Sequence, residues 1–160
     1  MGWGNKLLFF FSSLGAFNGL VLGIYFIFFT ARKHLSNYFL GALILALSIR
    51  IGKSVAFFFQ YDVPRTLLQI GLTACAFIGP FLYFFIKSEL NQTRKLPKPW
   101  MRQLVGWSLL VLAVGLVYPY EYYPWLWGNV IIPCIYLQWG CYIAFSVSLL
   151  MPVIKKMRKE

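Results

Sequence analysis

The chain has 160 residues and a formal net charge of +11, with 60% hydrophobic and only 12% charged residues. Soluble domains average about 25% charged residues, so this composition argues against a soluble domain and favours a membrane protein. The cations lie mostly in short segments between apolar runs, and no base-reading motif accompanies them, so a nucleic-acid partner is not expected despite the positive charge.

Five apolar runs are long enough, or nearly long enough, to cross a bilayer as helices of about 20 residues. We therefore predict an all-α, polytopic integral membrane helix bundle in which residues 1–160 form a single transmembrane domain. The predicted helices comprise, in chain order, about residues 7–30, 37–59, 66–86, 103–118 and 129–154. Trp100 and Met101 are candidates to extend the fourth and shortest helix.

The distribution of lysine and arginine orients this bundle, because cytoplasmic connections are enriched in cations. One side would hold most of them, namely Arg32, Lys33, Lys87, Arg94, Lys95, Lys98, Arg102, Lys155, Lys156, Arg158 and Lys159. The other side would hold Lys6 and Arg65. This asymmetry predicts an outer N-terminus and a cytoplasmic C-terminus. The Tyr- and Trp-rich segment 118–127 would then form an aromatic belt at the outer surface.

The first predicted helix carries Gly15, Gly19 and Gly23 at a spacing of four, which places a smooth groove on one face for close helix packing. Asn18 lies beside this groove near mid-membrane and needs a hydrogen-bond partner there. Two uses of the groove stay open: packing within one subunit and self-association.

The second predicted helix carries Arg50 and Lys53 in its outer half, three residues apart and therefore on one face. A bare charge in hydrocarbon is unfavourable, so both cations must reach water, lipid headgroups or a partner group. Three arrangements stay open: snorkelling to the outer headgroups, an internal polar pocket, and the lining of a pore.

In the pocket arrangement, the predicted partners of the two cations are Gln69 and Thr73 of the third helix and Gln138 of the fifth. Asp62 and Glu121 are the acids that could fold inward from the loops. An anionic ligand or a lipid headgroup is the other way to satisfy two unpaired cations. The predicted ligand-binding site consists of Arg50, Lys53, Gln69, Thr73 and Gln138.

The third predicted helix contains the pair Gly79-Pro80. Proline has no backbone N–H, so it leaves the carbonyl of Ala76 without its usual helical partner. Membrane helices tolerate such a break where neighbouring groups bond the freed carbonyl. The pair is a candidate hinge, and a simple bend in the helix is the alternative.

Catalytic and metal chemistry find little support. His34 is the single histidine, and the chain has no paired-carboxylate spacing, zinc-protease motif, serine-hydrolase motif or P-loop. The cysteines, all inside apolar runs, are Cys75, Cys134 and Cys141. We expect a non-enzymatic protein without metal or cofactor. A lipid-acting enzyme, the least supported alternative, would depend on Glu121, Asp62 or His34.

Several segments carry a family resemblance. They are 14–20 (LGAFNGL), 31–34 (ARKH) with the following Asn37 and Leu40, 47–53 (LSIRIGK) and 79–83 (GPFLY). On these segments the chain resembles the membrane-embedded N-terminal region of bacterial AraC-type transcription regulators, in which a multi-helix membrane sensor precedes a cytoplasmic DNA-binding module. That module has no counterpart here. The resemblance implies a bacterial inner-membrane module that senses or recruits, either as a fragment of a longer regulator or as a free-standing relative.

The expected function is that of a non-enzymatic inner-membrane sensor or scaffold. It would bind a protein, a lipid or a small anionic ligand near Arg50, Lys53 and Gln69 and signal to a cytoplasmic partner. The alternative is a pore-forming or transport subunit, such as the membrane effector of a bacterial defence or stress system. The expected partners are anionic lipid headgroups and either another protein or further copies of the chain.

Overall fold

The computed structural model describes residues 3–30, 34–59 and 63–157, and every regular element in them is helical. The elements are α1 (Trp3–Phe28), α2 (Leu35–Phe59), α3 (Arg65–Leu90), α4 (Lys98–Val117), α5 (Pro124–Leu126), the π-helical segment η1 (Trp127–Ile131) and α6 (Ile132–Met157). Five segments are long and apolar enough to cross a membrane, the last being the continuous stretch Pro124–Met157. The prediction of an all-helical chain with five long apolar helices is confirmed.

Most helix ends differ from the predicted ones by one to five residues, and α1 begins at Trp3 rather than at residue 7. Helix α3 continues to Leu90 rather than 86, and α4 begins at Lys98 rather than 103. The apolar run that defined each prediction reflects the thickness of hydrocarbon, whereas a helix can continue into polar residues beyond it. Pro99 lies in the first turn of α4, where proline is favoured because the N–H that it lacks would have no helical partner.

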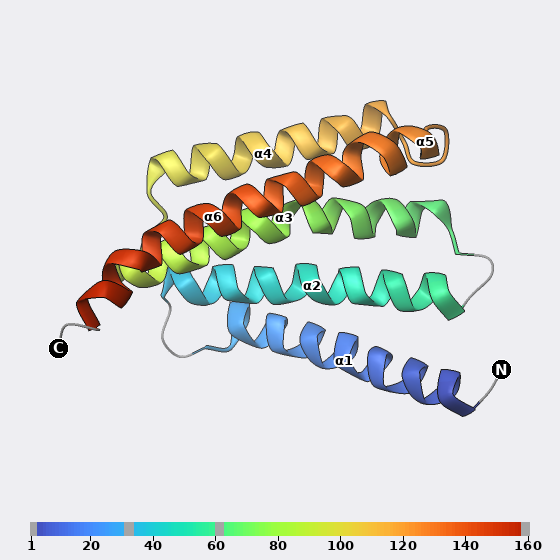
Figure 1. Ribbon diagram of the computed structural model, residues 1–160, viewed down its shortest axis with the longest axis horizontal. Coiled ribbons are helices and arrows are strands. Elements are labelled where there is room, and N and C mark those ends of the chain that lie inside the picture. The colour runs from blue at the N-terminus through green and yellow to red at the C-terminus, as the bar shows by residue number, and fades with distance from the viewer. Residues whose placement is uncertain (1–2, 31–33, 60–62, 158–160) are drawn as a thin grey trace.

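Consecutive long helices run in opposite directions, so the described chain starts and finishes at opposite ends of the bundle (Figure 1). One end, called here the basic end, carries Lys87, Arg94, Lys95, Lys98, Arg102, Lys155 and Lys156. The other, called the aromatic end, carries the connection 118–123 between α4 and α5 together with the cations Lys6 and Arg65. The other cations assigned to the basic end, Arg32, Lys33, Arg158 and Lys159, lie outside the described residues, as does Asp62.

Helix α3 lies at the centre of the bundle, where it packs against α2, α6 and α4, whereas α1 packs against α2 at one edge (Figure 1). The buried clusters follow α3 along its length. Cys75 and Ala76 pack with α4 and α6, Ile78 packs with α2, and Phe84 packs between Phe39 and Trp100 near the basic end. The fold is therefore organised around one helix.

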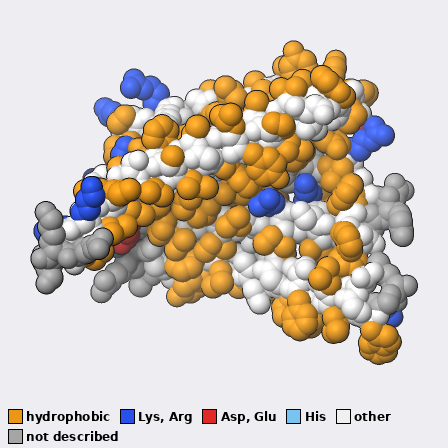
Figure 2. Space-filling view, viewed as in Figure 1, with side chains coloured by type: hydrophobic (Ala, Val, Ile, Leu, Met, Phe, Trp, Pro, Cys, Tyr) orange, Lys and Arg blue, Asp and Glu red, His pale blue; other side chains and the backbone are white. Residues whose placement is uncertain are grey.

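The outer surface of the bundle is strongly apolar. Large side chains such as Phe11, Leu109 and Leu137 are 65%, 62% and 71% exposed. Figure 2 shows hydrophobic side chains over much of one face, with basic side chains gathered toward the basic end, a few in the middle and others at the aromatic end. Soluble proteins rarely expose continuous apolar surface of this extent, so the surface fits a hydrocarbon environment.

Candidate functional site

Arg50 of α2 rests on the indole ring of Trp139 in α6. The guanidinium carbon lies 4.7 Å from the ring centroid, within the range of a cation–π contact. The ring is held in place because Trp139 Nε1 donates a 2.8 Å hydrogen bond to the carbonyl of Cys75 in α3. Arg50 is half-buried, and within the described part of the chain no carboxylate forms an ion pair with it.

Lys53 lies beside α3, with its aliphatic stem across Gly71. A Cβ atom added at Gly71 would lie 2.7 Å from Lys53 Cγ and 2.8 Å from Lys53 Cβ, so only glycine leaves room for the stem. The stem is thus packed against protein, as the apolar part of a lysine side chain often is. Among the residues that the structure describes, the ammonium group has no ion-pair partner.

Arg50 and Lys53, together called the cation pair, lie well inside α2. Phe59, the last residue of α2, is about 14 Å from Arg50 and about 9 Å from Lys53 along the axis, at about 1.5 Å per residue. The pair is therefore nearer the aromatic end, as predicted from sequence numbering. Figure 2 shows basic side chains within the apolar middle of the face over α2, a helix whose only cations are these two.

The predicted polar partners lie on another side of α3. Gln69 Nε2 donates to the carbonyl of Gly115 in α4 (2.8 Å), and Gln69 Oε1 accepts from the backbone N–H of Tyr120 (3.1 Å). Arg65 Nη1 donates to the backbone carbonyl of Glu121 (3.0 Å). These bonds hold the 118–123 connection against the start of α3, and both polar atoms of the Gln69 amide bond to backbone groups rather than to the cation pair.

Replacing Gln69 by leucine is expected to destabilise the aromatic end by about 1–3 kcal/mol, because it leaves the Gly115 carbonyl and the Tyr120 N–H without these partners. Hydrogen exchange at the Tyr120 amide should become faster, and the free energy of unfolding should fall. Thr66→Val, an exposed position one turn away, serves as the control. Equal exchange at Tyr120 in both variants would contradict the fastening role of Gln69.

Gln138 also bonds away from the cation pair. Its Nε2 donates to the carbonyl of Ala76 (3.0 Å), and Trp107 Nε1 donates to the same oxygen (3.0 Å). Gln138 and Thr73 line a cavity of about 180 Å³ between α3, α4 and α6, and Gln138 Oε1 is buried without a hydrogen-bond partner in the described part of the chain. The structure therefore brings Arg50 and Lys53 together but not with Gln69, Thr73 or Gln138.

The carbonyl of Ala76 is the one expected to lose its helical partner to Pro80. The two donors from α4 and α6 now satisfy it, which is the arrangement that allows a proline inside an apolar helix. Gly79 allows close packing here, since an added Cβ would lie 3.0 Å from Cδ2 of Tyr142. A hinge role for Gly79 and Pro80 stays a prediction.

The glycine groove of α1 divides into two parts. Gly19 and Gly23 face α2: a Cβ atom at Gly23 would lie 3.0 Å from the backbone oxygen of Gly41, and one at Gly19 would overlap Ser48. At Gly15 no atom lies within 4 Å of an added Cβ. Asn18 is exposed, and its side chain makes no hydrogen bond with the described residues. Packing within one subunit thus accounts for two glycines, while Gly15 and Asn18 face outward.

Two of the residues on which the lipid-acting alternative depends, His34 and Glu121, lie at opposite ends of the bundle. His34 precedes α2 at the basic end, whereas Glu121 lies at the aromatic end. No three histidine, cysteine, aspartate or glutamate side chains of the described residues are grouped so as to hold a metal ion.

Sequence reasoning missed Trp139, Gly71 and Trp107, although each has a role at or near the predicted site. The indole side chains and the glycine gave no signal, because aromatic residues make up 20% of the chain and glycines recur in most spans. No protein family, curated protein or solved structure matches this chain.

Proposed function

We propose that this chain is a multi-pass protein of the bacterial inner membrane with its N-terminus outside and its C-terminus in the cytoplasm. Five long apolar helices and termini at opposite ends of the bundle support five crossings. The basic end carries most of the described lysines and arginines, so it is the cytoplasmic end by the positive-inside rule. The bacterial assignment rests on the resemblance to AraC-type regulators.

Within that membrane the protein acts as a non-enzymatic sensor or scaffold that binds an anionic group at the cation pair. The observation that carries this proposal is the pair itself: two half-buried cations inside an apolar span, with no carboxylate partner among the described residues. An unpaired charge at this depth is unfavourable, and an anionic ligand would relieve that cost. Arg50 contacts Trp139, the Lys53 stem packs on Gly71, and the two residues are three apart on α2, so one anion could be bound by both.

A path from the cation pair to the cytoplasmic side runs along α2. At the basic end the Leu35 N–H donates to the carbonyl of Thr93 in the connection between α3 and α4 (3.3 Å). Phe39 of α2 stacks on Phe84 of α3, with the ring centroids 5.5 Å apart. A shift of α2 on ligand binding would therefore move the connection between α3 and α4 at the basic end. A cytoplasmic protein partner could bind this connection and respond to the change.

The double variant Arg50→Ala/Lys53→Ala tests the site. Wild-type protein in detergent should melt at a higher temperature with inorganic phosphate, glycerol phosphate or phosphatidylglycerol, since a ligand at 100 times its Kd stabilises by about 2.7 kcal/mol. The double variant should fold but lose this stabilisation. Lys155→Ala/Lys156→Ala removes the same charge from the basic end and should keep it. Equal stabilisation of wild type and Arg50→Ala/Lys53→Ala would remove the proposed site.

A pore-forming or transport subunit is the second candidate, and it is favoured by the outward Gly15 and Asn18 of α1. A polar amide facing lipid gains a partner when a second copy covers it, because interhelical amide bonds stabilise membrane helix pairs. Conductance in liposomes separates the two functions. A pore should conduct anions and lose its selectivity in Arg50→Ala, whereas a monomer that does not conduct leaves only the sensor or scaffold.

A further inference from the structure

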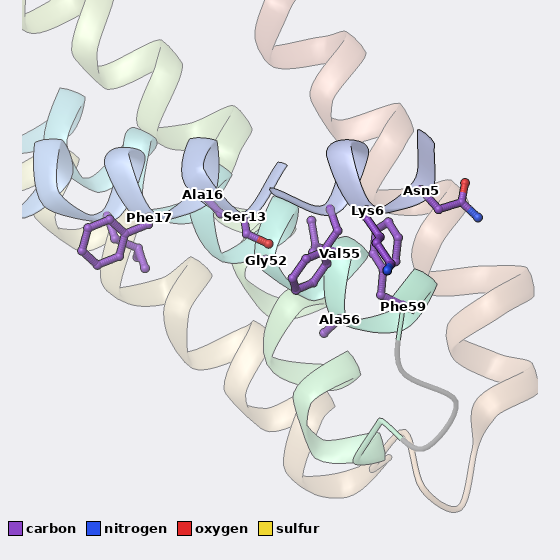
Figure 3. Close-up of a pocket in the computed structure, with 11 residues that line it drawn as sticks. Asn5, Lys6, Ser13, Ala16, Phe17, Gly52, Val55, Ala56 and Phe59 are labelled. Atoms are coloured by element: carbon purple, nitrogen blue, oxygen red, sulfur yellow. The ribbon is translucent and has the colours of Figure 1, made fainter. Parts of the chain in front are cut away.

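Helices α1 and α2 enclose a cleft near the aromatic end. Their backbones are closest around Gly23 and Gly41, and the two helices diverge toward the N-terminus of α1 (Figure 1). The cleft between them has a volume of about 620 Å³. It is seen in Figure 3, where the labelled side chains from the two helices are Asn5, Lys6, Ser13, Ala16 and Phe17 on α1 and Gly52, Val55, Ala56 and Phe59 on α2.

The walls of the cleft are mostly apolar, and the one charged group among its described lining residues, Lys6, lies with Asn5 at one end. Phe9, Phe17, Leu20, Val55 and Phe59 provide most of the apolar surface, with the hydroxyl of Ser13 among them. Such a lining offers few partners for water, which needs two to four hydrogen bonds to occupy a buried site. In a bilayer, hydrocarbon is the medium that would fill it.

The mouth of the cleft carries a positive charge. Lys6 and Asn5 lie in the first turns of α1, at the aromatic end, and both side chains are exposed. The Lys6 ammonium lies 6.0 Å from the Trp3 ring centroid and has no ion-pair partner in the described part of the chain. An apolar cleft with a cation at its mouth is complementary to a molecule with an anionic head and a hydrocarbon tail.

The dimensions of the cleft select among such occupants. From Lys6 to Leu20 it extends about 21 Å along α1, at about 1.5 Å per residue, which exceeds one leaflet of a hydrocarbon core about 30 Å thick. The volume of about 620 Å³ is spread along this length, so the cleft is long and narrow, a shape that suits an extended acyl chain.

We propose that the cleft between α1 and α2 binds one anionic phospholipid, with an acyl chain between the helices and the phosphate near Lys6 and Asn5. This inference rests on the membrane location proposed above, but it concerns a different site. The guanidinium of Arg50 lies on Trp139 of α6. Arg50 also lines a neighbouring hollow that shares Val55 and Phe59 with the cleft. Lys6 and Gly52 line the cleft but not that hollow, so they can be changed without altering the surroundings of Arg50 directly.

The test uses the whole chain, purified in a mild detergent, and counts bound lipids by native mass spectrometry. Phosphatidylglycerol should bind with a stoichiometry of one at this site, and phosphatidylcholine with the same acyl chains should bind more weakly. Lys6→Ala should weaken phosphatidylglycerol binding about five-fold, as expected for loss of one cation near an anionic headgroup. Lys155→Ala removes a cation from the basic end and is the charge control.

Gly52→Leu tests the acyl-chain part of the site. No atom lies within 4 Å of a Cβ added at Gly52, so leucine fits there and fills part of the cleft. Gly140 of α6 is equally open but lies outside the cleft, so Gly140→Leu is the matched control. We expect at least a ten-fold loss of phosphatidylglycerol binding in Gly52→Leu and no change in Gly140→Leu, with both variants melting near the wild-type temperature.

Three results would overturn the inference. Equal phosphatidylglycerol binding by Gly52→Leu and Gly140→Leu would place the lipid elsewhere. Equal binding of phosphatidylglycerol and phosphatidylcholine, with no weakening in Lys6→Ala, would show that the site does not recognise an anionic headgroup. Loss of the lipid only in Arg50→Ala/Lys53→Ala would assign it to the cation pair, which would support the proposed function and reject the cleft. Conversely, an unaffected double variant with loss in Lys6→Ala and Gly52→Leu supports the cleft alone.

Discussion

Replacing Gly23 by leucine is expected to destabilise the packing of α1 on α2 by about 1–3 kcal/mol or more, the range found when side-chain volume is forced into a packed interior. A Cβ atom at Gly23 would lie 3.0 Å from the backbone oxygen of Gly41 and 2.6 Å from Leu45 Cγ. Leu45 can change its rotamer, but the backbone of α2 cannot move without separating the helices. The measurement is the free energy of unfolding in detergent, with hydrogen exchange along α1.

Gly15→Leu is the matched control, because Gly15 belongs to the same stripe of α1 and has no atom within 4 Å of an added Cβ. Both substitutions gain the same helix propensity, which is slightly less than the difference of about 0.8–1.0 kcal/mol between glycine and alanine, so their difference isolates the packing term. We expect Gly15→Leu to be neutral or slightly stabilising. Equal stability of the two variants would show that α1 does not pack on α2 through Gly23.

The second large effect concerns the carbonyl of Ala76. The double variant Trp107→Phe/Gln138→Met removes both donors and should cost several kcal/mol, the price of an unsatisfied backbone group in an apolar medium. Each single variant leaves the other donor in place and should cost only about 0.6 kcal/mol, as is typical of one side-chain bond between membrane helices. Gln138→Met should cost even less, because it also removes the unpaired Oε1.

The double-mutant cycle, measured through unfolding free energies, should therefore show strong coupling between Trp107 and Gln138. The same cycle in a Pro80→Ala background is the control, since residue 80 then has an N–H that can bond the Ala76 carbonyl within the helix. Coupling should largely disappear there. If the losses of unfolding free energy in the two single variants simply added up in the double variant, the Ala76 carbonyl would not depend on having a donor from α4 or α6.

The sequence predicted more of the fold than of the candidate site. Apolar length determined the five helices, and the chemistry of proline determined that Ala76 would need outside donors. The identity of those donors could not be predicted, because Trp107 and Gln138 belong to helices whose rotation relative to α3 depends on packing. The same pattern holds for Arg50: its depth in α2 follows from residue counting, but its contact with Trp139 does not.

The predicted pocket placed Gln69 and Thr73 with the cation pair because all lie at similar depth. The depth of a residue in the membrane does not determine on which face of its helix the residue lies. Gln69 and Thr73 are each two residues from Gly71, which places them about 200° away around α3 from the position that seats Lys53. Because Gly71 is the position that contacts Lys53, the helical repeat places the Gln69 amide and the Thr73 hydroxyl on a different face of α3 from the cation pair.

Composition and residue order alone determined the apolar helices, the asymmetry of charge between the two ends, and the presence of two cations within one span. These properties depend on local hydrophobicity and on the rise per residue, which need no knowledge of neighbours. The tertiary structure decided that Gly23 meets Gly41, that the two glutamines bond to backbone groups rather than to the cation pair, and that α1 and α2 diverge into a cleft. Those outcomes depend on which helix faces touch, and the pattern of small and large side chains determines this only when all the helices pack together.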